Sequence, residues 1–267
     1  MRGVIEKGSA WALVTGASRG IGFEYARQMA ERGYNLVVVA DNGEELTEAA
    51  RKVAEEFGVE VRTKVLDLIP QQAAHELFAW TESEGLQIEV LINNAGAFSY
   101  LDVLKSDFAR IDELIGLHIT TPTITCRLYG EQMAARGHGY ILNMSSYSIW
   151  MPLPGLTLYS ASKDYLKSFS RAYAKEVRER GVTVTAVCPA GVTTDLYGLP
   201  RDWQRFGRRI GVLISAKKCA RQALRAMYRH KKVFVPAAWF RIFVPILTTL
   251  PKPITDFARK HTMRFQK

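Results

Sequence analysis

Residues 11–22 read Trp-Ala-Leu-Val-Thr-Gly-Ala-Ser-Arg-Gly-Ile-Gly (WALVTGASRGIG), and this stretch decides the fold. The apolar run from Trp11 to Thr15 predicts a strand that stops at Gly16, and a helical pattern follows Gly22. A strand, a glycine turn and a helix in this order allow backbone N–H groups and the positive end of the helix dipole to hold a pyrophosphate. The spacing is G-x-x-x-G-x-G, and a tight strand-to-helix turn also needs glycine for packing alone.

A second apolar run, residues 34–40, predicts a strand that ends in Asp41, 19 residues after Gly22. A carboxylate at this position accepts both ribose hydroxyls of an adenosine and repels a 2′-phosphate, so Asp41 favours NAD over NADP. Arg19 in the glycine loop favours NADP, because its cation can pair with a 2′-phosphate. Asp41 carries more weight, because a buried like-charge clash costs more than a flexible arginine gains. The alternative for Asp41 is a helix cap in front of Glu44.

The next segments continue the alternation of strand and helix. Residues 44–57 predict an amphipathic helix, residues 59–66 predict a strand that ends at Asp67, and residues 90–92 predict a strand followed by Asn-Asn-Ala-Gly at 93–96. Asp67 either contacts adenine or caps the next helix. The alternation predicts an α/β, Rossmann-like doubly wound parallel sheet with right-handed crossovers and helices on both faces.

The segment from Asn143 to Lys163 holds three side chains at spacings that chemistry can use. Tyr159 and Lys163 are four residues apart, so a helix places them on one face. An ammonium beside a phenol favours the phenolate, which predicts a Tyr159 pKa below the usual value of about 10. Ser146 ends an apolar strand pattern and can hydrogen-bond the oxygen that Tyr159 protonates. An exposed Tyr/Lys helix pair is the alternative interpretation.

Composition indicates one reduced, metal-free domain. The chain has 267 residues with 48% hydrophobic content, which suits a single α/β core. Its three cysteines are far apart and form no Cys-x-x-Cys pair, which argues against a disulfide scaffold or a zinc site. The first residues are too polar for an export signal, so we expect a cytoplasmic protein.

Positive charge is concentrated in the last quarter of the chain. Residues 201–267 contain 17 Lys and Arg and two Asp, whereas residues 1–200 contain 19 Lys and Arg and 24 Asp and Glu. This asymmetry fits an anionic membrane surface, an acidic carrier protein or a negatively charged substrate. A solvated basic rim is the alternative. Nucleic acid is not expected, because no recognition module accompanies the basic residues.

Together these motifs resemble the short-chain dehydrogenase/reductase family, and in particular its broad set of bacterial NAD(P)-dependent oxidoreductases. The resemblance covers roughly residues 10–235 and is highly specific, because its motifs occur in the order and spacing of the family. They are TGASRGIG at 15–22, NNAG at 93–96, Ser146, YSASK at 159–163 and CPAGVTT at 188–194.

The resemblance implies a role for each matching residue. Tyr159 would be the catalytic acid or base, Ser146 would polarise the carbonyl, and Lys163 would assist Tyr159 and bind the nicotinamide ribose. Asp67 would meet adenine and Asn93 the adenosine side. The set expected to contact NAD, or NADP as the alternative, is Thr15, Gly16, Ser18, Arg19, Gly20, Ile21, Gly22, Asp41, Asp67, Asn93, Ala95, Gly96, Tyr159, Lys163, Pro189, Val192 and Thr194.

Two positions depart from the family pattern. His118 stands where the family usually has an asparagine that supports a water relay to the lysine. A histidine can both donate and accept, so His118 is a candidate catalytic residue that keeps, retunes or breaks the relay, and a packed helix residue is the alternative. Ala190 replaces the usual glycine, and its added bulk is expected to shift the nicotinamide contact.

We expect a catalytic domain at residues 1–236, with a substrate lid at about 195–215, and a C-terminal extension at residues 237–267. In the lid, Trp203, Phe206 and Ile210 share a helical face that arginines surround, which indicates a hydrophobic substrate with an acidic end; an ordinary core helix is the alternative. The extension is apolar and basic and contains prolines, so packing on the pocket or a subunit interface is favoured over membrane contact.

These features predict an oxidoreductase that interconverts a secondary alcohol and a ketone on a largely hydrophobic molecule, either steroid-like or 3-oxoacyl. The resemblance also implies a homodimer or homotetramer. The competing hypothesis is a nucleotide-sensing or membrane-associated binding protein that kept this fold and lost efficient catalysis.

Overall fold

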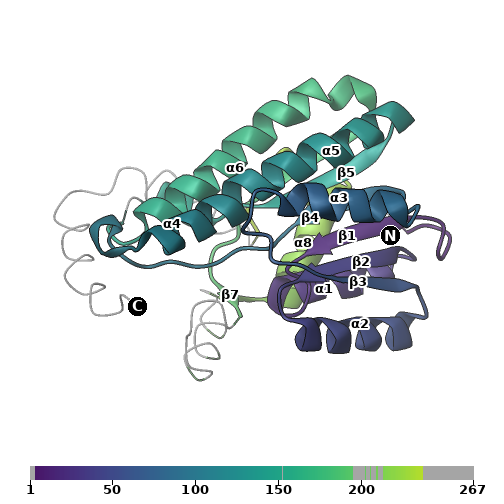
Figure 1. The fold of residues 1–267 in the computed structure, drawn as a ribbon, viewed down its shortest axis with the longest axis horizontal. Helices are drawn as coiled ribbons and strands as arrows, with labels where there is room; N and C mark the ends of the chain where they lie inside the picture. The colour runs from purple at the N-terminus through teal and green to yellow at the C-terminus, as the bar shows by residue number, and fades with distance from the viewer. Residues whose placement is uncertain are drawn as a thin grey trace.

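The structure is a computed structural model that describes residues 4–151, 153–194 and 213–236, together with positions 202, 205 and 209. Within this part of the chain, seven strands form one sheet in the order β3-β2-β1-β4-β5-β6-β9, and every neighbouring pair is parallel (Figure 1). This arrangement confirms the prediction of a Rossmann-like doubly wound sheet.

The strands are short and nearly continuous in apolar residues, as a parallel sheet covered on both faces requires. The third and fourth strands differ from the predicted bounds by one or two residues at their ends. The strands of the sheet are β1 (Trp11–Thr15), β2 (Asn35–Ala40), β3 (Val61–Val65), β4 (Ile88–Asn93), β5 (Gly139–Met144), β6 (Val182–Val187) and β9 (Val233–Phe234). A separate short pair joins β7 (Val192–Thr193) to β8 (Ile214–Ser215).

Helices cover both faces of the sheet (Figure 1). One layer holds α1 (Gly20–Ala30), α2 (Gly43–Phe57) and α8 (Ala216–Met227), and the other holds α3 (Ala73–Ser83), α5 (Thr121–Arg136) and α6 (Thr157–Glu176). Helix α4 (Phe108–Ile115) runs into α5 through one π-helical turn, η2 (Gly116–Thr120). Short 3₁₀ turns lie at Val103–Lys105, Tyr147–Trp150 and Arg178–Arg180.

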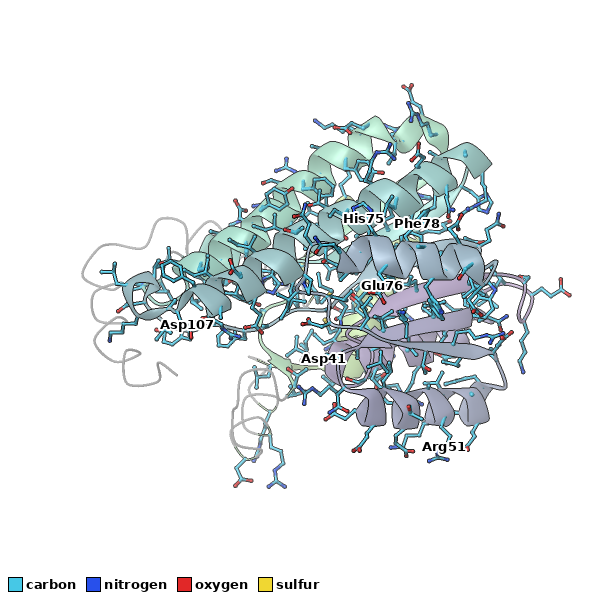
Figure 2. The ribbon with its side chains drawn as sticks, in the orientation of Figure 1. Asp41, Arg51, His75, Glu76, Phe78 and Asp107 are labelled. Carbon is cyan, nitrogen blue, oxygen red and sulfur yellow. The ribbon has the colours of Figure 1, made fainter. Side chains whose placement is uncertain are left out.

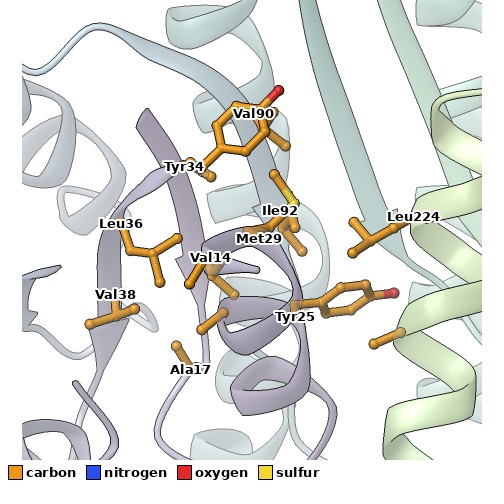
Figure 3. Close-up of a cluster of buried hydrophobic side chains, with 14 of the residues drawn as sticks. Val14, Ala17, Tyr25, Met29, Tyr34, Leu36, Val38, Val90, Ile92 and Leu224 are labelled. Atoms are coloured by element: carbon orange, nitrogen blue, oxygen red, sulfur yellow. The ribbon is translucent and has the colours of Figure 1, made fainter. Parts of the chain in front are cut away.

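The apolar core on the first face joins the two halves of the sheet. Tyr25 and Met29 of α1 pack with Leu224 of α8 over Val14 and Ile92 of the central strands (Figure 3). The hydroxyl of Tyr25 donates to the Met144 sulfur at 3.1 Å. Because α1 begins at the glycine loop, this core also fixes that loop over the ends of the strands.

Several predicted features fall outside the described residues. These are most of the predicted lid, including Trp203, Phe206 and Ile210, and the whole extension at 237–267. In the described ranges, no helix combines the length and apolar character needed to cross a membrane.

We predict that Leu224→Ala lowers the free energy of unfolding by about 2–5 kcal/mol, because Leu224 is fully buried and its removal leaves a cavity between α8 and α1. Urea unfolding measures the loss. The matched control is Leu104→Ala at a fully exposed leucine, which should change stability by less than about 0.5 kcal/mol. Equal losses in the two variants would contradict the assignment of this core.

Candidate active site

A cavity of about 440 Å³ opens at the carboxyl ends of β1, β2, β3 and β4. Loops that follow parallel strands meet at this edge, which is where open α/β sheets bind ligands. The cavity is lined by ten residues of the predicted cofactor set: Gly16, Ser18, Arg19, Gly20, Ile21, Asp41, Asp67, Ala95, Gly96 and Thr194. The predicted set therefore converges on one cavity, although the sequence places its members far apart.

The glycine loop has the properties of an anion cradle. Gly16 has φ +64°, and a Cβ atom there would lie 2.9 Å from the Cα of Ala95, so only glycine fits. Arg19 precedes α1 in an extended conformation and makes no side-chain cap, and the first turn of α1 has no acidic residue. The first N–H groups of α1 are therefore free of side-chain caps and suit a pyrophosphate.

Thr15 and Gly22 support this loop from behind and do not line the cavity. The Thr15 hydroxyl accepts the N–H groups of Asn94 and Ala95, each at 3.0 Å. The amide of Asn94 donates to the carbonyl oxygens of Thr15 at 3.0 Å and Gly16 at 3.2 Å. A Cβ on Gly22 would lie 1.9 Å from the Gly16 oxygen, so α1 packs directly on the loop. Asn94 lines the cavity and was missed from sequence.

Asn93 does not line the cavity, and its predicted contact with the cofactor stays a prediction. Asn93 is buried, its amide donates to the Asn143 oxygen at 2.9 Å, and its own oxygen accepts from Thr125 at 3.0 Å. As the last residue of β4, it follows the alternation of the strand and points into the α5 side of the sheet. The useful asparagine is the next residue, which has left the strand.

Asp41 lies in the cavity at the end of β2 (Figure 2). The alternative that Asp41 caps α2 is wrong, because the cap is Asn42, whose side chain accepts from the Glu45 N–H at 3.1 Å. The Asp41 carboxylate accepts the N–H of Asn42 at 3.0 Å. Arg19, which also lines the cavity, has its guanidinium 3.6 Å from the Glu45 carboxylate, so its charge already faces a carboxylate.

Asp67 also lines the cavity, next to Leu68 and Ile69, which sequence reasoning missed. Its carboxylate accepts the Ile69 N–H at 2.9 Å, which fixes the turn after β3. The cap of α3 is Gln72, so the alternative cap function for Asp67 is wrong. Its contact with adenine stays a prediction.

Ser146 and Tyr159 meet beside the cavity. Ser146 follows β5, and its hydroxyl hydrogen-bonds the side chain of Tyr159, which is only 5% exposed near the start of α6. The Tyr159 ring lies edge-on to Phe98, a residue of the cavity wall, with 5.1 Å between ring centroids. Burial raises the pKa of the Tyr159 hydroxyl to about 12, and the Ser146 bond opposes this rise. The phenol therefore holds its proton at neutral pH.

Lys163 lies on the same buried face of α6, as predicted. Its Nζ donates to the Met144 carbonyl at 3.0 Å and lies 6.0 Å from the centroid of the Tyr159 ring. Burial lowers the pKa of Lys163 to about 7. The prediction that Lys163 lowers the Tyr159 pKa is therefore wrong in this structure: Ser146 lowers it, while burial disfavours charge on both side chains.

His118 is a buried residue with both ring nitrogens bonded. Its Nε2 accepts the Ala97 N–H at 3.2 Å, and its Nδ1 lies 2.9 Å from the Ser162 hydroxyl. Burial lowers the pKa of His118 well below its usual value, and nearby Lys163 and Arg110 lower it further. The imidazole is therefore neutral and packed, and its part in a relay to Lys163 stays a prediction.

Two buried apolar clusters involve residues of the predicted site. Tyr159 packs with Leu114, Leu156 and Phe98, and Ala190 packs with Tyr147 and Cys188. Pro189 accepts the Tyr147 N–H at 2.8 Å, and Val192 is buried in the β7–β8 pair, so neither lines the cavity, and their predicted cofactor contacts stay predictions. In the described part of the chain, no group of three or more His, Cys, Asp or Glu is placed to hold a metal ion.

Comparison with known proteins agrees with this geometry. The model of the short chain dehydrogenase family matches residues 10–205. The very-long-chain 3-oxoacyl-CoA reductase of Anas platyrhynchos is 38% identical over 192 residues, covering 70% of this chain and 61% of that protein. This chain thus matches less than two thirds of the length of that relative.

Two solved structures share the fold over nearly the whole chain. A bulky-bulky ketone specific alcohol dehydrogenase from Comamonas testosteroni is 28% identical, with a TM-score of 0.76, covering 92% of this chain and 96% of that one. A short-chain dehydrogenase from Sphingobium yanoikuyae, in complex with NADPH, is 27% identical, with a TM-score of 0.79, covering 96% and 95%. The chain therefore belongs to the short-chain dehydrogenase family of NAD(P)-dependent oxidoreductases.

Proposed function

We propose that this protein reduces a ketone on a largely hydrophobic substrate to a secondary alcohol, with Tyr159 as the proton donor. The observation that carries the proposal is the hydrogen bond between Ser146 and a buried, protonated Tyr159 next to the cavity wall. A phenol that keeps its proton suits donation to a carbonyl oxygen, which is the direction of reduction.

The residues divide the chemistry among them. The dinucleotide, when bound, supplies the hydride. The glycine loop and the start of α1 hold its pyrophosphate, while Asp41 receives a ribose. Ser146 orients the substrate oxygen toward the Tyr159 hydroxyl, and Lys163 lies next to Gly96 at the edge of the cavity, where it can bind the second ribose.

The substrate class we propose is a 3-oxoacyl thioester with a long acyl chain. Tyr159 packs with Phe98, and Phe98 lines the cavity together with Leu117, so the part of the cavity nearest Tyr159 is apolar and suits an aliphatic chain. The 38% identity to a very-long-chain 3-oxoacyl-CoA reductase supports the same class, and the basic last quarter of the chain suits an anionic carrier group. A bulky ketone without a carrier is the second candidate, which the similarity to the Comamonas testosteroni enzyme favours.

NAD(H) is the cofactor we propose, with NADP(H) as the alternative. The support is the carboxylate of Asp41 in the cavity, which would repel a 2′-phosphate, and the ion pair of Arg19 with Glu45, which occupies the cation that would attract one. The NADPH in the Sphingobium yanoikuyae structure favours the alternative. A cytoplasmic homodimer or homotetramer is proposed as well.

We predict that Tyr159→Phe lowers the turnover of ketone reduction by about 10²–10⁴-fold, since the proton donor is lost. Dinucleotide affinity, measured by calorimetry, should change little, because the Tyr159 hydroxyl lies beside the cavity rather than in its lining. The matched control is Tyr165→Phe, an exposed tyrosine on the same helix, which should keep full turnover. Full turnover in Tyr159→Phe would show that Tyr159 is not the proton donor.

A second prediction concerns cofactor choice. Asp41→Asn should shift the ratio of NADPH to NADH affinity toward NADPH by about tenfold, because one negative charge leaves the rim. Calorimetric titration with each dinucleotide measures the shift. Glu76→Gln, at an exposed residue of α3 that does not line the cavity (Figure 2), is the control and should leave the ratio unchanged. An unchanged ratio in Asp41→Asn would show that Asp41 does not select the cofactor.

A further inference from the structure

His118 connects three segments whose relative positions matter for the proposed reaction. It lies in the π-helical turn η2, contacts Ala97 in the loop after β4, and contacts Ser162 on α6. The Ser162 hydroxyl in turn donates to the carbonyl oxygen of Tyr159 at 2.9 Å. The chain of contacts thus runs from a wall of the cavity to the backbone of the proton donor.

The directions of these hydrogen bonds fix the tautomer. A backbone N–H can only donate, so Nε2 of His118 accepts from Ala97 and carries no proton. In the neutral ring the proton is then on Nδ1, which donates to the Ser162 hydroxyl. That hydroxyl donates its own hydrogen to the carbonyl oxygen of Tyr159. Each of the three hydrogen bonds then has one donor and one acceptor. The opposite tautomer of His118 would leave the bond to Ala97 with two donors.

The ring also occupies a space that cannot shift easily. A Cβ atom on Gly96 would lie 2.8 Å from Nε2 of His118 and 3.2 Å from Nζ of Lys163. Both side chains are therefore packed closely against this glycine. The His118 ring stands edge-on to Tyr159, with 5.6 Å between centroids. A π-helical turn is rare and often marks a functional site, and here it presents the ring between the cavity loop and α6.

The charged and titratable groups that face the ring are Lys163 and Tyr159 from α6 and Arg110 from α4. Two of them are cations, and no carboxylate faces the ring among the groups that shift its pKa. Burial, together with these cations, lowers the pKa of His118, so a charged imidazolium is disfavoured here. A proton on Nε2 would also set two donors against each other at Ala97.

We propose that His118 is a positioning residue: its neutral, Nδ1-protonated ring holds the loop at Ala97 and the start of α6 at the separation that brings Tyr159 and Lys163 to the cavity. The proposal rests on the proposed function and adds to it the residue that sets the geometry. His118 does not touch the reacting atoms; it acts through Ser162 and Ala97.

Two substitutions of the ring break one link each. His118→Gln can place an oxygen near the position of Nε2 and keep the Ala97 contact, but it loses the donor to Ser162. His118→Asn can place an amide near the position of Nδ1 and keep the Ser162 contact, but it is too short to reach Ala97. Ser162→Ala removes the middle link and leaves the ring in place, so it tests the chain even if the ring variants fold poorly.

The first measurement is ¹⁵N NMR of the histidine ring nitrogens in the whole protein, with the His118 signals assigned by their loss in His118→Gln. We expect a proton on Nδ1, an unprotonated Nε2 and no protonation between pH 8 and pH 6. A proton on Nε2, or protonation within this range, would overturn the proposal. This readout needs no turnover, so a protein without reductase activity would contradict the proposed function and leave the tautomer test intact.

The second measurement is steady-state reduction with a 3-oxoacyl thioester and NADH. His118→Gln, His118→Asn and Ser162→Ala should each lower kcat, on the order of 10²-fold, with KM for NADH nearly unchanged, because a displacement of about 1 Å costs this much. The control is His75→Gln at an exposed histidine of α3 (Figure 2), which should match the unmodified protein. Unchanged kcat in folded Ser162→Ala and His118→Gln would show that His118 is only a packing residue.

Discussion

The absence of space at Gly16 and Gly22 is the constraint on which the site depends. With a Cβ at either position the glycine loop would collide with Ala95 or with its own backbone, so the loop, the start of α1 and the loop after β4 form one close-packed unit. Thr15 and Asn94 lock this unit with hydrogen bonds across the ends of β1 and β4. The apolar core between α1 and α8 then holds it against the sheet. Packing within the protein therefore fixes the shape of the glycine loop without any contact from a dinucleotide.

Burial controls the electrostatics of the reactive residues more than their pairing does. Tyr159 and Lys163 are both removed from water, and the same effect raises the pKa of the phenol to about 12 and lowers the pKa of the ammonium to about 7. Both groups are pushed toward neutrality, and Ser146 supplies the opposing hydrogen bond. At neutral pH the phenol of Tyr159 therefore keeps its proton.

Sequence patterns predicted the architecture well because each strand and helix is marked locally. The apolar runs, the glycine turn and the amphipathic repeat at 44–57 all correspond to observed elements. Errors arose where two adjacent residues point in different directions and the sequence does not show which of them faces the site. Asn93 and Asn94 are neighbours, yet only the second lines the cavity, and Asp41 and Asn42 are neighbours, yet only the second caps α2. The degree of burial around Tyr159 and Lys163 depends on elements distant in sequence, so spacing alone gave the wrong sign for the Tyr159 pKa.

The most direct test of the account is to follow NADH absorbance when the purified protein is mixed with a long-chain 3-oxoacyl thioester. We expect one NADH to be consumed for each 3-hydroxyacyl product formed, with slower consumption of NADPH. Dinucleotide binding without consumption, on this substrate and on a bulky ketone alike, would contradict the claim that Ser146 and Tyr159 form a working reductase site.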